Sequence, residues 1–257
     1  MRTDILGVGF DGITVAQAVS HTFDLFETGE KAYIVTPNPE IVWQCRRDLR
    51  LRDAVNGAGI VLPDGVGIIL AARILGTPIS TGRAPGIDFA SSIFERMAGS
   101  GRSVFLLGSK PGVAEDASKK LIDKYPGLIV SGTSDGYFTD DSAIIKQVND
   151  ARPDLLLVCL GSPKQELWMT QNIGRLDVRL CAGLGGSLDV FAGRVKRAPA
   201  FFRKLGLEWF YRLVCEPRRI KRMIKLPVFI LAVIFKRMNG PVPAQLSFRA
   251  RIRKRKM

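Results

Sequence analysis

Short apolar segments alternate with helix-like segments along residues 1–193. The apolar segments predict strands within the ranges 3–10, 31–38, 59–65, 103–112, 128–138, 154–162 and 178–193. Helical spacing of apolar residues occurs in the ranges 13–28, 39–58, 66–76, 113–127, 141–153 and 164–173. Strands and helices that alternate in this way form parallel sheets. We therefore expect an α/β fold, Rossmann-like, with a mostly parallel sheet and helices on both faces.

The positive charge of the chain is concentrated at its C-terminal end. The whole chain has 38 Lys and Arg against 24 Asp and Glu, and 19 of these basic residues but only two of the acidic ones lie in 194–257. The composition therefore changes near Gly193. We predict an α/β domain at residues 1–193 and a basic helical appendage at 194–257, which suits an anionic partner.

The appendage combines basic with apolar and aromatic residues, which is typical of a basic amphipathic helix at a membrane surface. An apolar run from Leu226 to Phe235 is bounded by lysines. It is shorter than the about 20 residues that a membrane span requires. The pattern favours a helix that lies on an anionic membrane surface. The alternative is a solvated basic face on a segment that packs against the protein body.

Metal binding and secretion receive no support from the sequence. The four cysteines have no C-x-x-C spacing, and His21 is the only histidine, so no zinc site is expected. Reduced cysteines suit the cytosol. The first 14 residues include acidic side chains and no long apolar run, which predicts neither a signal peptide nor an N-terminal anchor.

Polar residues and glycines follow the predicted strands. One segment, LLLVCLGSPKQELW, passes from a buried strand directly to Lys164, Gln165 and Glu166. Each such position alone fits ordinary turn or helix-cap chemistry. The ends of parallel strands meet at one edge, so together these residues predict a site for a sugar nucleotide. They are Thr36, Asn38, Asp64, Arg83, Gly108, Gly136, Tyr137, Gln165, Gly185, Gly186 and Asp189.

Several motifs occur in the order found in a known family. They are TPNPEIV, LPDGVGI, RAPGID, FLLGSKPGVAEDA, YPGLIVSGTSDGYF, LGSPKQELW, GLGGSLDVFAG, RAP and GLEWFYRLVCEPRRIKR, over residues 1 to about 225. The chain thereby resembles the WecG/TagA/CpsF glycosyltransferases. The resemblance implies inverting, metal-independent transfer of a sugar from a UDP donor to polyprenyl diphosphate-linked N-acetylglucosamine, at the cytoplasmic membrane face. It implies no cofactor and a peripheral membrane protein of teichoic acid or other cell-surface polysaccharide synthesis.

The resemblance also implies roles for individual residues. Asp64 corresponds to the proposed general base. Apart from the resemblance, Glu166 is the next carboxylate in line for that role. Arginines of the appendage would close over the donor diphosphate. The remaining active-site set comprises Thr36, Asn38, Arg83 and Gln165, and the appendage arginines are Arg212, Arg219 and Arg222. The expected donor sugar is N-acetylmannosamine; N-acetylmannosaminuronic acid or glucose remain alternatives.

Two features agree with a metal-free transferase. No D-x-D pair, which often holds a divalent ion in UDP-sugar transferases, occurs in the chain. Arginine can bind diphosphate in its place because the guanidinium stays charged and bonds phosphate bidentately.

Two other classes of function share some of these sequence features. A dinucleotide-dependent oxidoreductase would share the fold, but GVGFDG lacks the G-x-G-x-x-G spacing. A nucleic-acid-binding protein would explain the terminal RARIRKRK. The slightly acidic body and the apolar run argue against nucleic acid as the partner.

Overall fold

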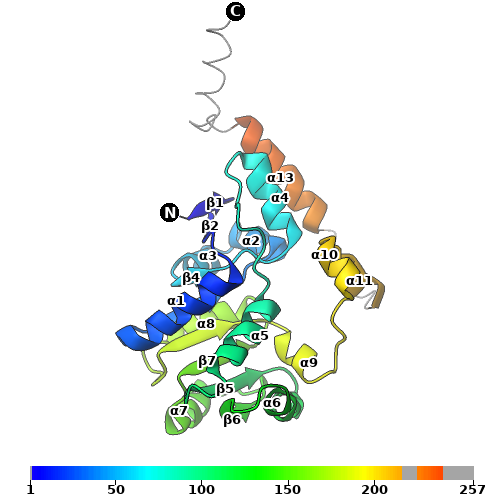
Figure 1. The fold of residues 1–257 in the computed structure, drawn as a ribbon. Helices are drawn as coiled ribbons and strands as arrows, with labels where there is room; N and C mark the ends of the chain where they lie inside the picture. The colour runs from blue at the N-terminus through cyan, green and yellow to red at the C-terminus, as the bar shows by residue number, and fades with distance from the viewer. Residues whose placement is uncertain (1, 216–224, 240–257) are drawn as a thin grey trace, which may run out of the picture.

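A six-stranded parallel sheet forms the centre of the computed structural model, which describes residues 2–215 and 225–239 (Figure 1). Its strand order is β4-β3-β8-β7-β5-β6, and every neighbouring pair is parallel. The strands are β3 (Ala32–Val35), β4 (Ile60–Val61), β5 (Ser103–Gly108), β6 (Ile129–Ser134), β7 (Leu155–Cys159) and β8 (Leu180–Gly183). The expected α/β fold with a mostly parallel sheet is confirmed.

Helices cover both faces of the sheet, and its strands alternate their side chains between two apolar cores. In β3, Tyr33 and Val35 face one core and Ile34 faces the other. The first core receives α2 (Pro39–Cys45), α3 (Leu49–Asn56), α4 (Val66–Leu75), α7 (Asp141–Ala151) and α8 (Lys164–Asn172). The second receives α1 (Val15–Thr28), α5 (Gly86–Met97), α6 (Val113–Lys124) and α9 (Ser187–Phe191). Burial on both faces explains the uninterrupted apolar strands.

Three predicted elements are divided in the structure. The range 3–10 is not one strand but a hairpin of β1 (Thr3–Ile5) and β2 (Val8–Phe10), separate from the main sheet. The predicted helix 39–58 is split into α2 and α3, because Asp48 caps a new helix by accepting from the N–H of Leu51. Range 178–193 contains β8 followed by the short helix α9.

Helix α5 was not predicted. It begins directly after Pro85 and has no side-chain cap. Its buried residues nevertheless recur at helical spacing, at Phe89, Ile93, Phe94 and Met97. The helical spacing of these apolar residues was therefore a signal from which α5 could have been predicted.

The C-terminal segment contains α10 (Ala200–Lys204), α11 (Glu208–Cys215) and α13 (Lys225–Asn239). Helix α13 lies beside α4 and α2, and its Phe229 and Val233 are fully buried in the first core (Figure 1). Lys225 pairs with Glu40 at 3.1 Å. The inner face of α13 thus packs on the body, as the alternative interpretation expects. A domain boundary at residue 193 stays a prediction.

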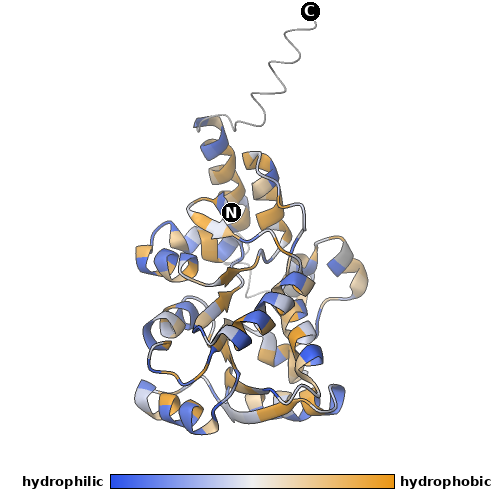
Figure 2. Cartoon of the chain, turned by 60° about the vertical axis from the view of Figure 1, so that its left-hand side comes forward, coloured by the Kyte–Doolittle hydropathy of each residue, from blue (hydrophilic) through white to orange (hydrophobic). Residues whose placement is uncertain are grey.

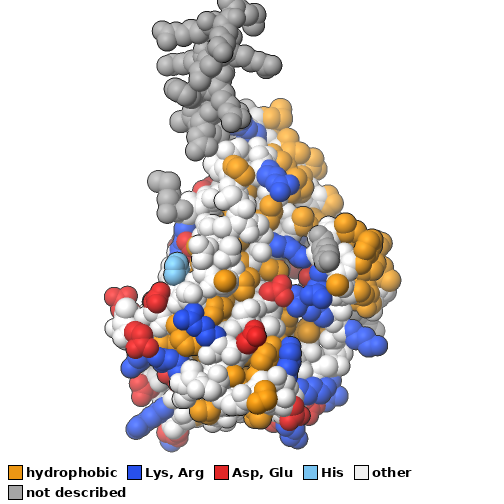
Figure 3. Space-filling view, in the orientation of Figure 1, with side chains coloured by type: hydrophobic (Ala, Val, Ile, Leu, Met, Phe, Trp, Pro, Cys, Tyr) orange, Lys and Arg blue, Asp and Glu red, His pale blue; other side chains and the backbone are white. Residues whose placement is uncertain are grey.

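The outer face of α13 exposes apolar side chains, among them Leu231 and Phe235, which are 65% and 69% exposed. Hydrophobic residues are frequent in α4 and α13 (Figure 2), and hydrophobic side chains gather on the surface over α13 and over α10 and α11 (Figure 3). Within residues 2–215 and 225–239, no helix has the length and apolar character needed to span a bilayer.

Candidate active site

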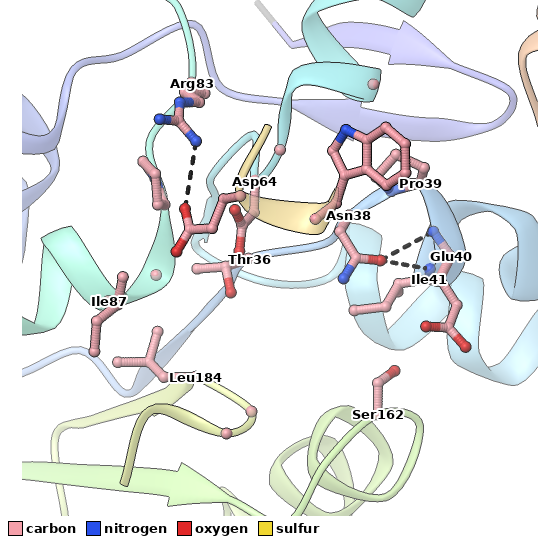
Figure 4. Close-up of a pocket in the computed structure, with 18 of the residues that line it drawn as sticks. Thr36, Asn38, Pro39, Glu40, Ile41, Asp64, Arg83, Ile87, Ser162 and Leu184 are labelled. Atoms are coloured by element: carbon pink, nitrogen blue, oxygen red, sulfur yellow. Dashed lines mark hydrogen bonds and ion pairs between the residues drawn. The ribbon is translucent and has the colours of Figure 1, made fainter. Parts of the chain in front are cut away.

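A cavity of about 340 Å³ lies at the carboxyl edge of the sheet, near the ends of β4, β3, β8 and β7. Seven of the residues predicted from the sequence line it: Thr36, Asn38, Asp64, Arg83, Gln165, Gly185 and Gly186. The first four are labelled in Figure 4. Most of these residues follow the ends of β3, β4, β7 and β8, which the parallel topology places at one edge, whereas Arg83 lies in the loop between α4 and α5. The position and polarity of the cavity suit a polar ligand with several oxygen atoms.

Thr36 and Asn38 occupy the loop after β3. Asn38 caps α2, because its side-chain oxygen accepts from the N–H groups of Glu40 and Ile41 at 2.9 and 3.1 Å (Figure 4). The cap uses the side-chain oxygen, so the amide nitrogen is the atom suited to a ligand. A Cβ atom at Gly86 would lie 3.0 Å from Thr36 Oγ1. Glycine at that position lets α5 approach the threonine closely.

Asp64 stands in the turn between β4 and α4. Its backbone N–H points to the carbonyl of Pro37 at 3.4 Å, which ties the two loops together. Gly65 follows with φ of 89°, a conformation that favours glycine. The turn brings the Asp64 carboxylate into the same cavity as Thr36 (Figure 4). A carboxylate in this position has the chemistry of a general base.

Arg83 links the cavity to the C-terminal helices. Its Nη1 lies 3.6 Å from Oε2 of Glu208 at the start of α11, and its Nη2 donates to the carbonyl of Arg203 (Figure 4). Glu208 and Trp209 themselves line the cavity. The C-terminal segment therefore forms part of the cavity wall. Sequence reasoning missed both residues, although Trp209 stood out as an aromatic residue among the basic ones.

Gln165 lies in the floor of the cavity and is held by two hydrogen bonds. Its Oε1 accepts from the N–H of Gly185 at 3.0 Å, and its Nε2 donates to Oε1 of Glu166 at 2.9 Å. Glu166 is 1% exposed and does not line the cavity. Burial raises the pKa of Glu166, and the bond from Gln165 opposes that rise. The Lys164 ammonium points elsewhere and donates to the carbonyl of Gly136 at 3.0 Å.

The other predicted residues form a second group, at the ends of β5 and β6 and in α9. Ser109 Oγ donates to the Asp189 carboxylate at 3.0 Å, and the N–H of Gly136 donates to the carbonyl of Ser109 at 2.9 Å. A Cβ atom at Gly108 would lie 2.3 Å from the carbonyl oxygen of Cys159. Tyr137 is 67% exposed. None of Gly108, Gly136, Tyr137 and Asp189 lines the cavity.

Three predicted arginines are not placed. The side chain of Arg212 and the whole of Arg219 and Arg222 lie outside the part of the chain that the structure describes. Among the residues it does describe, no group of three or more His, Cys, Asp or Glu side chains is arranged to hold a metal ion.

A parallel sheet with a carboxylate, an arginine and two amides around a cavity at its carboxyl edge defines the chain as an α/β protein with a site for a polar ligand. The model of the glycosyl transferase WecG/TagA/CpsF family matches residues 3–242. The chain therefore belongs to this glycosyltransferase family, and the resemblance predicted from the motifs is confirmed.

Curated relatives agree with that assignment. A protein of Bacillus spizizenii strain W23 is 34% identical over 217 residues, which is 84% of each chain. One of Staphylococcus aureus strain MRSA252 is 34% identical over 234 residues, or 90% of this chain and 92% of the relative. One of Bacillus subtilis strain 168 is 36% identical over 208 residues, or 81% of each. All three are named N-acetylglucosaminyldiphosphoundecaprenol N-acetyl-beta-D-mannosaminyltransferase.

Proposed function

We propose that this glycosyltransferase moves N-acetylmannosamine from a UDP-linked donor to undecaprenyl diphosphate-linked N-acetylglucosamine, in teichoic acid or related cell-surface polysaccharide synthesis. The names of relatives that share over four fifths of the chain support this acceptor and this sugar. The observation that carries the proposal is the cavity in which Thr36, Asn38, Asp64, Arg83 and Gln165 meet.

The proposed reaction is a single inverting displacement. The Asp64 carboxylate takes the proton of the acceptor hydroxyl while that oxygen forms a bond to the anomeric carbon of the donor sugar. The bond from this carbon to the UDP oxygen breaks, and UDP leaves with the electron pair. Arg83 is proposed to balance the charge that grows on the diphosphate. Arg212, Arg219 and Arg222 are proposed to assist from the C-terminal segment.

Product analysis tests the activity. The purified protein is incubated with UDP-N-acetylmannosamine and a short-chain lipid diphosphate-linked N-acetylglucosamine, with EDTA present. We expect a product heavier by one N-acetylhexosamine, with the anomeric configuration inverted. UDP-glucose and UDP-N-acetylmannosaminuronic acid serve as competing donors. A clear preference for either would overturn the proposed sugar, and activity that EDTA abolishes and manganese restores would overturn the metal-free mechanism.

We also propose that residues 194–257 place the enzyme at the anionic, cytoplasmic face of the cell membrane as a peripheral protein. The start of α13 borders the cavity, since Leu226 lines it, and the same helix carries the exposed apolar face. An apolar helix face flanked by basic residues suits a lipid surface. A lipid-linked acceptor would be bound at that surface.

Sedimentation with anionic vesicles tests the membrane proposal. Replacing Leu231 and Phe235 by serine should lower the bound fraction. The matched control is Ile129→Ser, which changes an exposed apolar residue at the opposite edge of the sheet. Equal binding by both variants would argue against the α13 face, and tighter binding to DNA at the same salt would favour the nucleic-acid alternative.

A further inference from the structure

The carboxyl group of Glu166 is buried beneath the cavity rather than inside it. The residue lies in the first turn of α8 and is 1% exposed; Gln165 donates to its Oε1, and the Ser162 hydroxyl also acts on the carboxyl group. Such an arrangement is costly, because a buried carboxylate loses its hydration. An apolar side chain of similar size would fill the same space at lower cost. The carboxyl group therefore needs a reason beyond packing.

The neighbouring amide supplies that reason. Gln165 is 3% exposed, yet part of it faces the cavity. One side of its amide is fixed by the Gly185 N–H, which donates to Oε1. The other side is fixed by Glu166, which accepts from Nε2. A flipped amide would set its N–H groups against the N–H of Gly185 and its oxygen against the oxygen of Glu166. Only one orientation of the amide is therefore favourable.

This orientation determines what Gln165 offers to a ligand. The Nε2 group has two N–H bonds, and Glu166 takes one of them. The second remains for an oxygen atom in the cavity. We propose that Glu166 is a positioning residue, which holds the Gln165 amide as a hydrogen-bond donor to a hydroxyl or carbonyl oxygen of the sugar substrates. The inference rests on the proposed function for the identity of those substrates.

The elevated pKa of Glu166 agrees with this role. A carbonyl oxygen at the same place can accept the bond from Gln165 whether or not a negative charge is present. Positioning therefore requires an acceptor atom rather than a charge. This distinguishes Glu166 from a general base, which must take up a proton during the reaction.

Two substitutions at Glu166 separate the acceptor from the packing. Glu166→Gln keeps an oxygen for Gln165 and should retain turnover within about 3-fold of the wild type. Glu166→Leu fills the volume but removes the acceptor, and we expect kcat/KM to fall about 3- to 10-fold, the worth of one hydrogen bond. The matched control is Asn172→Leu, which alters another buried polar residue of α8 and should lower the melting temperature while kcat/KM is preserved.

A double-mutant cycle then tests whether Glu166 acts through Gln165. Glu166→Leu in a Gln165→Ala background should cause no further loss of kcat/KM, because the amide to be positioned is gone. An equal loss in both backgrounds would overturn the inference. So would full activity of Glu166→Leu, or a loss in Glu166→Gln as large as in Glu166→Leu.

A measurement without substrate keeps this test independent of the proposed function. The side-chain amide signals of Gln165 in ¹H–¹⁵N spectra, assigned by comparison with Gln165→Ala, report the two hydrogen bonds directly. We expect these signals to move in Glu166→Leu and to stay near their wild-type positions in Glu166→Gln. Unchanged signals in Glu166→Leu would contradict the positioning role even if the enzyme used a different donor sugar.

Discussion

The two halves of the carboxyl edge of the sheet are built from different kinds of group. At the β4, β3, β8 and β7 ends, side chains such as Thr36, Asp64 and Gln165 surround a cavity. At the β5 and β6 ends, the contacts are largely backbone to backbone: Ser109 N–H donates to the Cys159 carbonyl, and Gly136 N–H to that of Ser109. The first half offers functional groups to a ligand, whereas the second holds neighbouring loops together.

This difference shows that one sequence signal has two physical meanings. Glycines and polar residues after a strand predicted a ligand site in both halves. Gly185 and Gly186 do line the cavity. Gly108, by contrast, has φ of 131° and no room for a Cβ atom, so the backbone itself requires glycine there. A glycine at a strand end therefore becomes evidence for a ligand only after its packing requirement is known.

The largest effect is expected in the half with the cavity. Asp64→Asn keeps the shape of the side chain but removes the base, so kcat should fall about 100- to 10,000-fold while the donor KM changes little. Thermal unfolding checks that the variant is folded. Near-normal turnover would assign the base to another group. Glu166, the alternative carboxylate, is poorly placed for it because it does not line the cavity.

A substitution in the other half should act on stability instead. In Gly108→Ala, the new Cβ atom would overlap the Cys159 carbonyl and the residue would keep a positive φ, so we expect a loss of more than about 3 kcal/mol in the free energy of unfolding. Urea titration measures it. Gly136→Ala is the milder control, since its nearest contact, at 3.1 Å, is the flexible side chain of Leu160. A normal unfolding free energy with a raised donor KM would show that Gly108 serves the ligand instead.

Periodicity explains how much of this arrangement could be predicted. Short uninterrupted apolar runs located the strands of the sheet and helical spacing located most of the helices, and parallel pairing then placed the strand ends at one edge. The break at Asp48 depends on a helix cap, which changes the periodic signal little. The helix after Pro85 does carry the apolar spacing of a helix and could have been predicted from it. The ion pair of Arg83 with Glu208 joins segments far apart in the chain, so no local pattern indicates it. The C-terminal wall of the cavity could be expected only from the family resemblance.

The cavity half is also distinguished by its contact with α13. Gly67 lies where three elements meet, and a Cβ atom there would be 2.6 Å from Pro39 Cγ and 2.9 Å from Leu226 Cδ1. Gly67→Ala should therefore displace the start of α13 and cost about 1–3 kcal/mol of unfolding free energy. A double variant with Leu226→Ala should recover part of that loss, because it removes one of the clashes. Additive losses would mean that α13 is not held through this contact.

The smallest effect on stability is expected at Tyr137, at the end of the half that lacks the cavity. This side chain is 67% exposed, so Tyr137→Ala should change the free energy of unfolding by no more than about 0.5 kcal/mol.

The predicted role of Tyr137 in binding the sugar nucleotide implies a separate effect of the same substitution, on the KM for the donor. An aromatic side chain stacked on a base contributes about 1–3 kcal/mol, so the donor KM should rise about 5- to 140-fold while kcat is retained. Tyr137→Phe keeps the ring and should behave like the wild type. If the donor KM of Tyr137→Ala were unchanged, the nucleotide would have to bind entirely on the cavity side, and the two halves of the edge would divide into a site and a scaffold.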